Sequence, residues 1–189
     1  MKWLFSILFL VYSLLINAQV IDINNFSEDT MNQVMFDEMN KYVKKIHNGD
    51  SLVWSNVIQK DIMTDNYNFI KRNYYKDINK LHNPKWLDRP WNDLPDTIKI
   101  KIIDESQGSQ IWNKKEYVIF TYTEILAGPF PVRNYTYQKI AQECIINWNK
   151  SPGHALYMNA NYENKVIVGV TSYYDKKRRM VYISFVYVS

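Results

Sequence analysis

The order of helical and strand patterns along the chain is the feature that most constrains its fold. Apolar residues recur at helical spacing in three segments: 31–46, 56–75 and 135–149. Strand-like alternation or β-branched content marks four more: 97–103, 116–123, 165–174 and 180–188. Helices come first, strands lie in the middle, and a helix and a hairpin close the chain. This order predicts an α+β fold, a three-layer α-β-α sandwich in which helices cover both faces of a central, mainly antiparallel sheet.

The chain has to be held together by packing, because a single cysteine allows no intrachain disulfide. Its 189 residues, 47% of them hydrophobic, are enough for one domain with a substantial core. Cys144 falls on the apolar face of the helical pattern over 135–149. We therefore interpret it as a small buried hydrophobe and not as a reactive thiolate.

The first 19 residues have the pattern of a secretory signal peptide. Lys2 supplies the charged start, an apolar run extends over 3–16, and Asn17 to Gln19 form a small-residue cleavage site. The apolar run is shorter than the roughly 20 residues of a spanning helix, which is the alternative interpretation, and no basic stop follows it. We predict a signal peptide over 1–19, a single domain over 20–189, and a secreted or periplasmic protein without a transmembrane segment.

The charge of the chain does not indicate nucleic acid as a partner. Removal of residues 1–19 takes away only Lys2, so the net charge falls from +4 by one unit to +3, which is mildly basic. The basic run "DKKRR" (175–179) is expected at the tip of a solvated hairpin. A role in binding acidic polymers is the alternative.

The stretch "NWNKSPGHALYMN" (147–159) places proline and glycine between two helical patterns. Ser151 suits an N-cap and Pro152 the first position of a new helix, where proline loses no intrahelical hydrogen bond. His154 then lies at the third position, where the helix dipole disfavours a charged imidazolium. A metal ligand or a general base has to be neutral. Packing or capping by His154 is the alternative, and no Gly-x-Ser-x-Gly pattern supports Ser151 as a nucleophile.

The same stretch resembles the signature of a known family. The pattern W-x-x-S-P-G-H-x-x-x-x-N is formed by Trp148, Ser151, Pro152, Gly153, His154 and Asn159. It resembles the CAP superfamily (cysteine-rich secretory proteins, antigen 5 and pathogenesis-related 1 proteins; the SCP-like domain) in its bacterial secreted form. Weaker similarity, in "MNKYVKK", "SLVW" and "IVGVTSYY", extends over 30–189. The resemblance implies a three-layer α-β-α sandwich, in agreement with the order of the patterns.

The resemblance also implies a cleft with two histidines and an acidic residue. His154 is the first histidine. The sequence "YTEILAG" places Glu124 where the family has the acid of its G-E-N motif, although Thr123 and Ile125 replace the flanking Gly and Asn. His82 is the candidate for the second histidine, because the chain has only three, and an ordinary loop histidine is the alternative.

Two further residues belong to the expected cleft. Ser151 occupies the position at which eukaryotic members carry a second acid, and Trp148 would lie beneath the cleft. The remaining histidine, His47, ends the first helical pattern, where a positive charge favours the helix C-terminus.

The resemblance implies a secreted or periplasmic binding module for a small apolar ligand such as a lipid, or for a cell-surface polymer. Its cleft would comprise His154, Glu124, His82, Ser151 and Trp148. Of these, His154, His82 and Glu124 form a set that suits zinc or another divalent cation, although the sequence requires no cofactor. A metal-assisted hydrolase of peptides or cell-envelope material is the alternative, with Glu124 as base or ligand. A purely structural pair of His154 and Glu124 is a third interpretation. No catalytic residue and no oligomeric state follow from the sequence.

Overall fold

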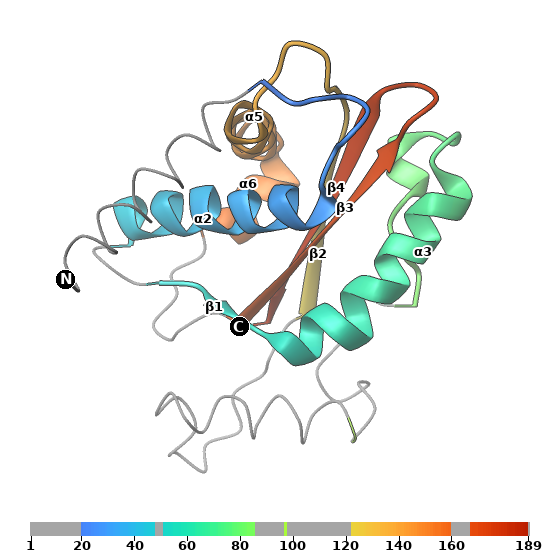
Figure 1. Cartoon of the computed structure of the whole chain (residues 1–189). Helices are drawn as coiled ribbons and strands as arrows, with labels where there is room; N and C mark the ends of the chain where they lie inside the picture. The colour runs from blue at the N-terminus through green and yellow to red at the C-terminus, as the bar shows by residue number, and fades with distance from the viewer. Residues whose placement is uncertain (1–19, 48–50, 86–96, 98–121, 160–166, 189) are drawn as a thin grey trace, which may run out of the picture.

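The structure is a computed structural model that describes residues 20–47, 51–85, 97, 122–159 and 167–188. Its elements, in chain order, are α2 (Glu28–Ile46), β1 (Val53–Trp54), the π-helical turn η1 (Ile58–Met63), α3 (Thr64–Asn73), the 3₁₀ turn η2 (Ile78–Lys80), β2 (Tyr122–Pro131), α5 (Tyr137–Lys150), α6 (Pro152–Met158), β3 (Ile167–Asp175) and β4 (Met180–Val188) (Figure 1). The predicted helices and the closing hairpin are confirmed. The helix expected over 56–75 begins with π-helical turns, which its apolar periodicity did not indicate.

The described strands form one sheet in the order β1-β3-β4-β2. β3 and β4 pair antiparallel from Ile167↔Val188 to Asp175↔Met180, and β2 pairs antiparallel with the other side of β4. β1 pairs parallel with β3 over only two residues. The sheet is therefore mainly antiparallel, as predicted.

Helices cover both faces of this sheet. α2 and α5 lie on one side, and η1 and α3 lie on the other (Figure 1). Side chains alternate along β4, because successive residues of a strand point to opposite faces. Val181, Ile183 and Phe185 belong to the core under α2 and α5, while Tyr182 packs with Ile70 of α3 in the opposite layer. The α+β, three-layer architecture is confirmed.

Helix α2 is defined by its ends and by a buried methionine stripe. Ser27 is its N-cap, with Oγ accepting a hydrogen bond from the Thr30 N–H at 3.1 Å. Met31, Met35 and Met39, at successive turns, are fully buried.

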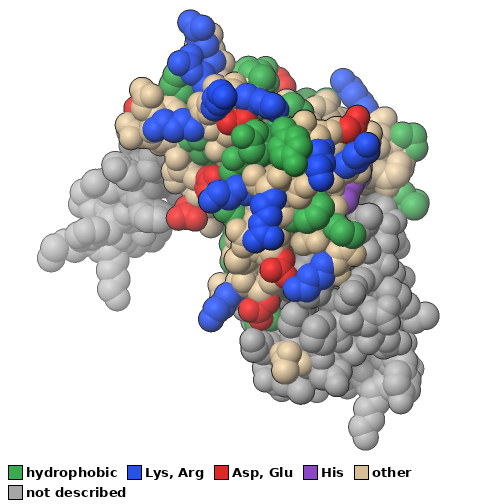
Figure 2. Space-filling view, turned by 90° about the vertical axis from the view of Figure 1, so that its right-hand side faces the viewer, with side chains coloured by type: hydrophobic (Ala, Val, Ile, Leu, Met, Phe, Trp, Pro, Cys, Tyr) green, Lys and Arg blue, Asp and Glu red, His purple; other side chains and the backbone are tan. Residues whose placement is uncertain are grey.

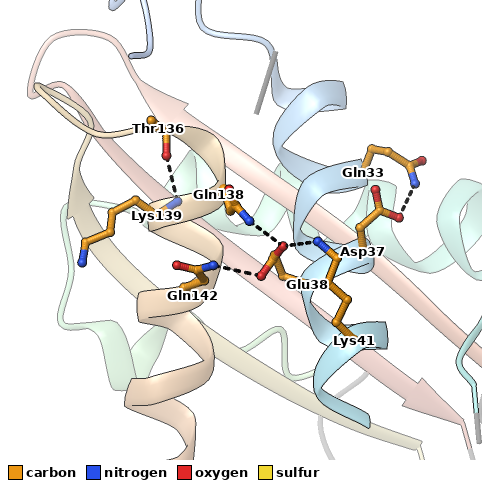
Figure 3. Close-up of polar contacts among 8 residues, drawn as sticks. All are labelled: Gln33, Asp37, Glu38, Lys41, Thr136, Gln138, Lys139 and Gln142. Atoms are coloured by element: carbon orange, nitrogen blue, oxygen red, sulfur yellow. Dashed lines mark hydrogen bonds and ion pairs between the residues drawn. The ribbon is translucent and has the colours of Figure 1, made fainter. Parts of the chain in front are cut away.

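A buried carboxylate sets how α2 and α5 meet. Glu38 of α2 accepts hydrogen bonds from Gln138 Nε2 (3.0 Å) and Gln142 Nε2 (3.1 Å) of α5, and from Lys41 Nζ of its own helix (Figure 3). Burial raises the pKa of the Glu38 carboxyl, but these hydrogen bonds and the Lys41 charge outweigh it and the pKa is lowered. The charged form is thus retained between the two helices and fixes their register.

The Gly- and Pro-rich stretch "AGPFPV" (127–132) has the composition of a chain break, but it is part of a strand. β2 continues to Pro131, with a register shift between Ala127 and Phe130 that accommodates a proline within a paired strand. Gly128 has φ +127°, and a Cβ there would lie 2.8 Å from the Val181 carbonyl oxygen. Only glycine allows this close approach to β4.

Several predictions fall wholly or largely outside the described residues. These are the signal peptide over 1–19 and the strands over 97–103, apart from Thr97, and 116–123, apart from its last two residues, which begin β2. Within the described segments, no helix combines the length and apolar character needed to cross a bilayer.

The basic run is confirmed as an exposed hairpin tip. Residues 176–179 form the turn between β3 and β4, and all four are exposed. The buried Asp175 Oδ1 accepts hydrogen bonds from the N–H groups of Lys177 (3.0 Å) and Arg178 (3.2 Å) and so orders the turn. On the face of the molecule that carries α3, Lys and Arg side chains are interspersed with acidic and apolar ones (Figure 2).

Two glycines provide a matched test of this packing. A Cβ on Gly169 of β3 would lie 2.5 Å from Ile58 Cγ2 and 2.8 Å from Met63 Cγ, whereas a Cβ on Gly153 would meet no described atom within 4 Å. We expect Gly169→Ala to lower the free energy of unfolding by about 1–3 kcal/mol, because it overpacks the η1–β3 contact. Gly153→Ala should change it by less than about 0.5 kcal/mol. Urea unfolding of both variants measures this, and equal effects would contradict the described packing.

Candidate functional site

The candidate site is built around the break between α5 and α6. Ser151 is extended (φ −91°, ψ 116°), its N–H bonds the Trp148 carbonyl at 3.1 Å, and its own carbonyl accepts from the Ala155 N–H at 2.8 Å. Ser151 thus ends one helix and begins the next, and α6 starts at Pro152 as predicted. A helix of seven residues then carries His154 in its first turn.

His154 is half-buried and electrostatically linked to His82. Burial lowers the pKa of the His154 imidazole, and the charge of His82 lowers it further. The two histidines therefore influence one another electrostatically although they are far apart in the sequence. The expected neutral state is supported, although its causes are burial and His82 and not the helix dipole named in the sequence analysis.

A buried polar chain anchors the loop that carries His82. Asn83 Nδ2 donates to Asn66 Oδ1 of α3 at 3.1 Å, and Asn66 Nδ2 donates to Ser184 Oγ of β4 at 3.3 Å. All three residues are at most 5% exposed. Buried polar groups are costly unless they are hydrogen-bonded. The Asn83–Asn66–Ser184 hydrogen bonds therefore hold Asn83, the residue after His82, against β4.

The anchor was missed in the sequence, although a signal for it was present. Asn66 lies three residues after Met63 and four before Ile70, which places it on the inward face of the helical pattern over 56–75. An amide at such a position has to find a buried partner. The identity of that partner depends on tertiary structure.

Trp148 supports the site from within the core. It is 1% exposed, and its Nε1 donates to the Leu126 carbonyl oxygen at 3.0 Å. Its ring meets that of Phe185 edge-on at 6.3 Å between centroids. The indole therefore fixes the end of α5 to β2, two residues from Glu124 in the sequence.

Glu124 and Ser151 occupy different kinds of position. Glu124 lies in β2, where its backbone pairs with Val186 of β4, and its side chain is outside what the structure describes. Ser151 is partly exposed at the helix junction. The structure thus relates His82 to His154 and leaves the Glu124 carboxylate as a prediction.

The fit of the site to a metal ion depends on Glu124. Among the described side chains, no three His, Cys, Asp or Glu residues come together in a way that could hold an ion. Two imidazoles supply two of the three protein ligands that an open zinc site uses. A three-ligand site at this position therefore requires the Glu124 carboxylate.

The single cysteine takes no part in this chemistry. Cys144 is fully buried on α5. Burial raises the pKa of its thiol well above the ordinary value, with a smaller contribution from Glu143. The neutral thiol is neither a nucleophile nor a metal ligand, which agrees with its interpretation as a core residue.

Comparison with solved structures finds a chain described as the CAP domain of Enterococcal PrgA. It shares 15% sequence identity with this chain at a TM-score of 0.44, and the alignment covers 90% of this chain and 66% of that one. A scan against protein-family models gives no match, and neither does a search of curated proteins. The function of the site therefore has to be inferred from the residues of this chain.

The environment of His154 predicts a pH-dependent stability. The pKa of His154 in the folded chain lies below the ordinary value of 6.5. At a pH between these two pKa values, the unfolded chain therefore binds more protons than the folded chain. The contribution of His154 to the free energy of unfolding is therefore lost as the pH falls below about 6.5. His154→Gln should flatten this slope and His47→Gln should not, as urea unfolding at stepped pH will measure. An unchanged slope in His154→Gln would contradict the assignment.

Proposed function

We propose that this chain is a secreted or periplasmic domain of the CAP type that binds a ligand in a cleft formed by His154, His82 and Glu124, with Ser151 at the rim and Trp148 beneath. In this proposal the three site residues hold a divalent cation, with zinc as the first candidate. The domain then acts as a binding module for a lipid or a cell-surface polymer.

The observation that carries the proposal is the association of His82 with His154. The charge of His82 disfavours protonation of His154, and both residues are partly exposed. The pKa of the His154 imidazole is lowered by burial and by His82, so His154 is favoured in the neutral form that a metal ligand requires. A divalent cation would take one ring nitrogen of each histidine as a ligand.

The way in which the histidines are held also supports the proposal. His154 follows the ordered break at Ser151, and His82 precedes the buried Asn83. Ligands positioned by packed elements need little reorganisation on binding. The motif W-x-x-S-P-G-H, which resembles the CAP signature, supplies the first of these two supports.

The exposed apolar side chains near the break are compatible with an apolar ligand. Leu156 of α6, two residues after His154, is 70% exposed, and Ile146 of α5 is 49% exposed. Single exposed apolar residues are common on protein surfaces, so these two support a lipid-like ligand only together with the neighbouring site.

Zinc titration by calorimetry tests the proposal directly. We expect one zinc ion per chain, and a loss of affinity of at least about tenfold in each of His154→Ala, His82→Ala and Glu124→Ala, because each removes a ligand of a three-ligand site. His47→Ala is the matched control, since it removes the third histidine of the chain and should leave binding unchanged.

Two results would count against the proposal. Absence of zinc binding at protein concentrations where the chain is folded would remove the metal from it. Binding that survives His154→Ala but is lost in His47→Ala would place the metal elsewhere.

A further inference from the structure

A separate cavity lies between the two helical layers, at the side of β3 that faces away from β4. Its volume is about 240 Å³, and its walls come from the first turns of α2, from η1 and α3, and from the middle of β3. Figure 1 shows the N-terminal end of α2 beside β3, which is where this cavity forms. At about 30 Å³ per water molecule, it has room for about eight waters or one small organic molecule.

The cavity exists because β1 stops short. β1 pairs with β3 only at Ile167 and Val168. Beyond Val168, side-chain oxygens accept hydrogen bonds from backbone N–H groups on this edge of β3. Gln59 Oε1 accepts from the Val170 N–H at 3.1 Å, and Glu28 Oε1 accepts from the Tyr174 N–H at 2.9 Å.

Ser172 lies midway between these two capped positions of β3. The edge-facing groups of an antiparallel strand alternate along its length, so the backbone N–H and C=O of Ser172 face the same edge as those of Val170 and Tyr174. Ser172 is also one of the residues that line the cavity. A ligand in the cavity would therefore meet a free strand edge.

The walls of the cavity carry negative charge and acceptor atoms. Glu28 and Asp29 both line it, and no Lys or Arg does so among the described residues. The nearest basic residue in an adjoining hollow, which shares these two carboxylates, is Lys176. Tyr67 contributes its ring and its hydroxyl, which donates to Glu28 Oε1 at 3.5 Å.

Asn32 is the observation that points to a ligand. It lines the cavity one helical turn after Glu28, is 8% exposed, and its buried Oδ1 has no hydrogen-bond partner among the residues that the structure describes. A buried amide oxygen without a donor is costly, on the order of 1–3 kcal/mol, and such groups in proteins normally have a partner. The O and N of an amide exchange by a flip of the side chain, so the oxygen can be turned toward a donor that enters the cavity.

We propose that this cavity binds a small organic amine, with its ammonium group between Asp29, Glu28 and the Asn32 carbonyl. An ammonium supplies the positive charge that the lining residues lack, and N–H donors for their acceptor oxygens. The alkyl part of the amine then makes apolar contact with Met63 and the Tyr67 ring. This inference is independent of the histidine cleft and does not rest on its function.

Two other ligand classes fit the walls less well. Anions are opposed by Glu28 and Asp29. A calcium ion takes six to eight oxygen ligands at about 2.3–2.6 Å, whereas the cavity is several times larger than such a shell needs and Glu28 Oε1 already accepts from Tyr174 and Tyr67. An ammonium accepts looser geometry than a metal ion, because it forms hydrogen bonds and not coordinate bonds.

The experiment is a titration of the purified protein with 1,4-diaminobutane, followed by calorimetry and by shifts of backbone amide NMR signals. We expect one site, with the largest shifts in the first turn of α2 and at Ser172. Asp29→Asn and Asn32→Leu should each weaken binding about tenfold or more, since each removes an acceptor of the charged group. Asp37→Asn, on the same helix and outside the cavity, is the matched control and should bind normally.

The variants also guard against misfolding as an explanation. Asp29 is exposed, so its amide variant should fold normally. Asn32→Leu removes a polar group that has no partner for its oxygen and should not lower the free energy of unfolding. 1,4-Butanediol has the same chain length as the diamine but no positive charge, and tetramethylammonium has the charge but no N–H donor. Both should bind at least about tenfold more weakly than the diamine.

Three outcomes would overturn the inference. These are no binding of the diamine at 10 mM, equal binding by Asn32→Leu and the unaltered protein, and calcium binding at the same residues without amine binding. Zinc binding at the histidines has no bearing on any of them, so a failure of the cleft proposal and a failure of the cavity proposal can be told apart.

Discussion

The pairing of β3 with β4 in one unbroken register, from Ile167↔Val188 to Asp175↔Met180, is the contact on which the rest of the structure depends. Both strands are buried on their two faces, so both faces of the sheet need a cover. Helices α2 and α5 supply one cover, and η1 with α3 supplies the other. With one buried cysteine and no disulfide, this double burial is what holds the domain together.

The two candidate sites follow from the two sides of this hairpin. On the β4 side, β2 adds a further strand, and Trp148 bonds to it at Leu126, which fixes the end of α5 and the helix break that carries His154. On the β3 side, β1 ends after two residue pairs and the edge beyond it is left to side chains. The β2 side thus supports the helix break that carries His154, and the acidic cavity lies along an edge that no described strand pairs with beyond Val168.

Polar residues inside the core link the layers as specifically as the apolar ones. Glu38 locks α2 against α5 through two glutamines, and Asn66 links α3 to β4 and to the loop after His82 (Figure 3 shows the first of these). Apolar contacts alone would allow the helices to slide, because they have little directional preference. The hydrogen bonds select one arrangement, and the position of His82 depends on it.

The sequence predicted those features that depend on local patterns. Apolar periodicity located α2, α5 and the hairpin, and the order of these elements was enough for the α+β sandwich. The proline at 152 located the break before α6, because its effect on the backbone is local.

Features that depend on tertiary neighbours were not predicted. The strand continues through Gly128 only because the β4 backbone lies against it, and a local pattern of Gly and Pro indicates a break there. The cause of the low His154 pKa is likewise tertiary, since burial and His82 are set by packing and not by position in the helix. The cavity beside β3 depends on where β1 stops, for which the chain carries no distinct composition.

The most direct test of the central claim is a crystal structure of the protein grown with zinc, with anomalous diffraction measured at the zinc edge. The account predicts one anomalous peak at about 2.0–2.2 Å from a ring nitrogen of His82, a ring nitrogen of His154 and a carboxylate oxygen of Glu124. A structure in which the two imidazoles point away from each other, with no peak between them, would contradict it.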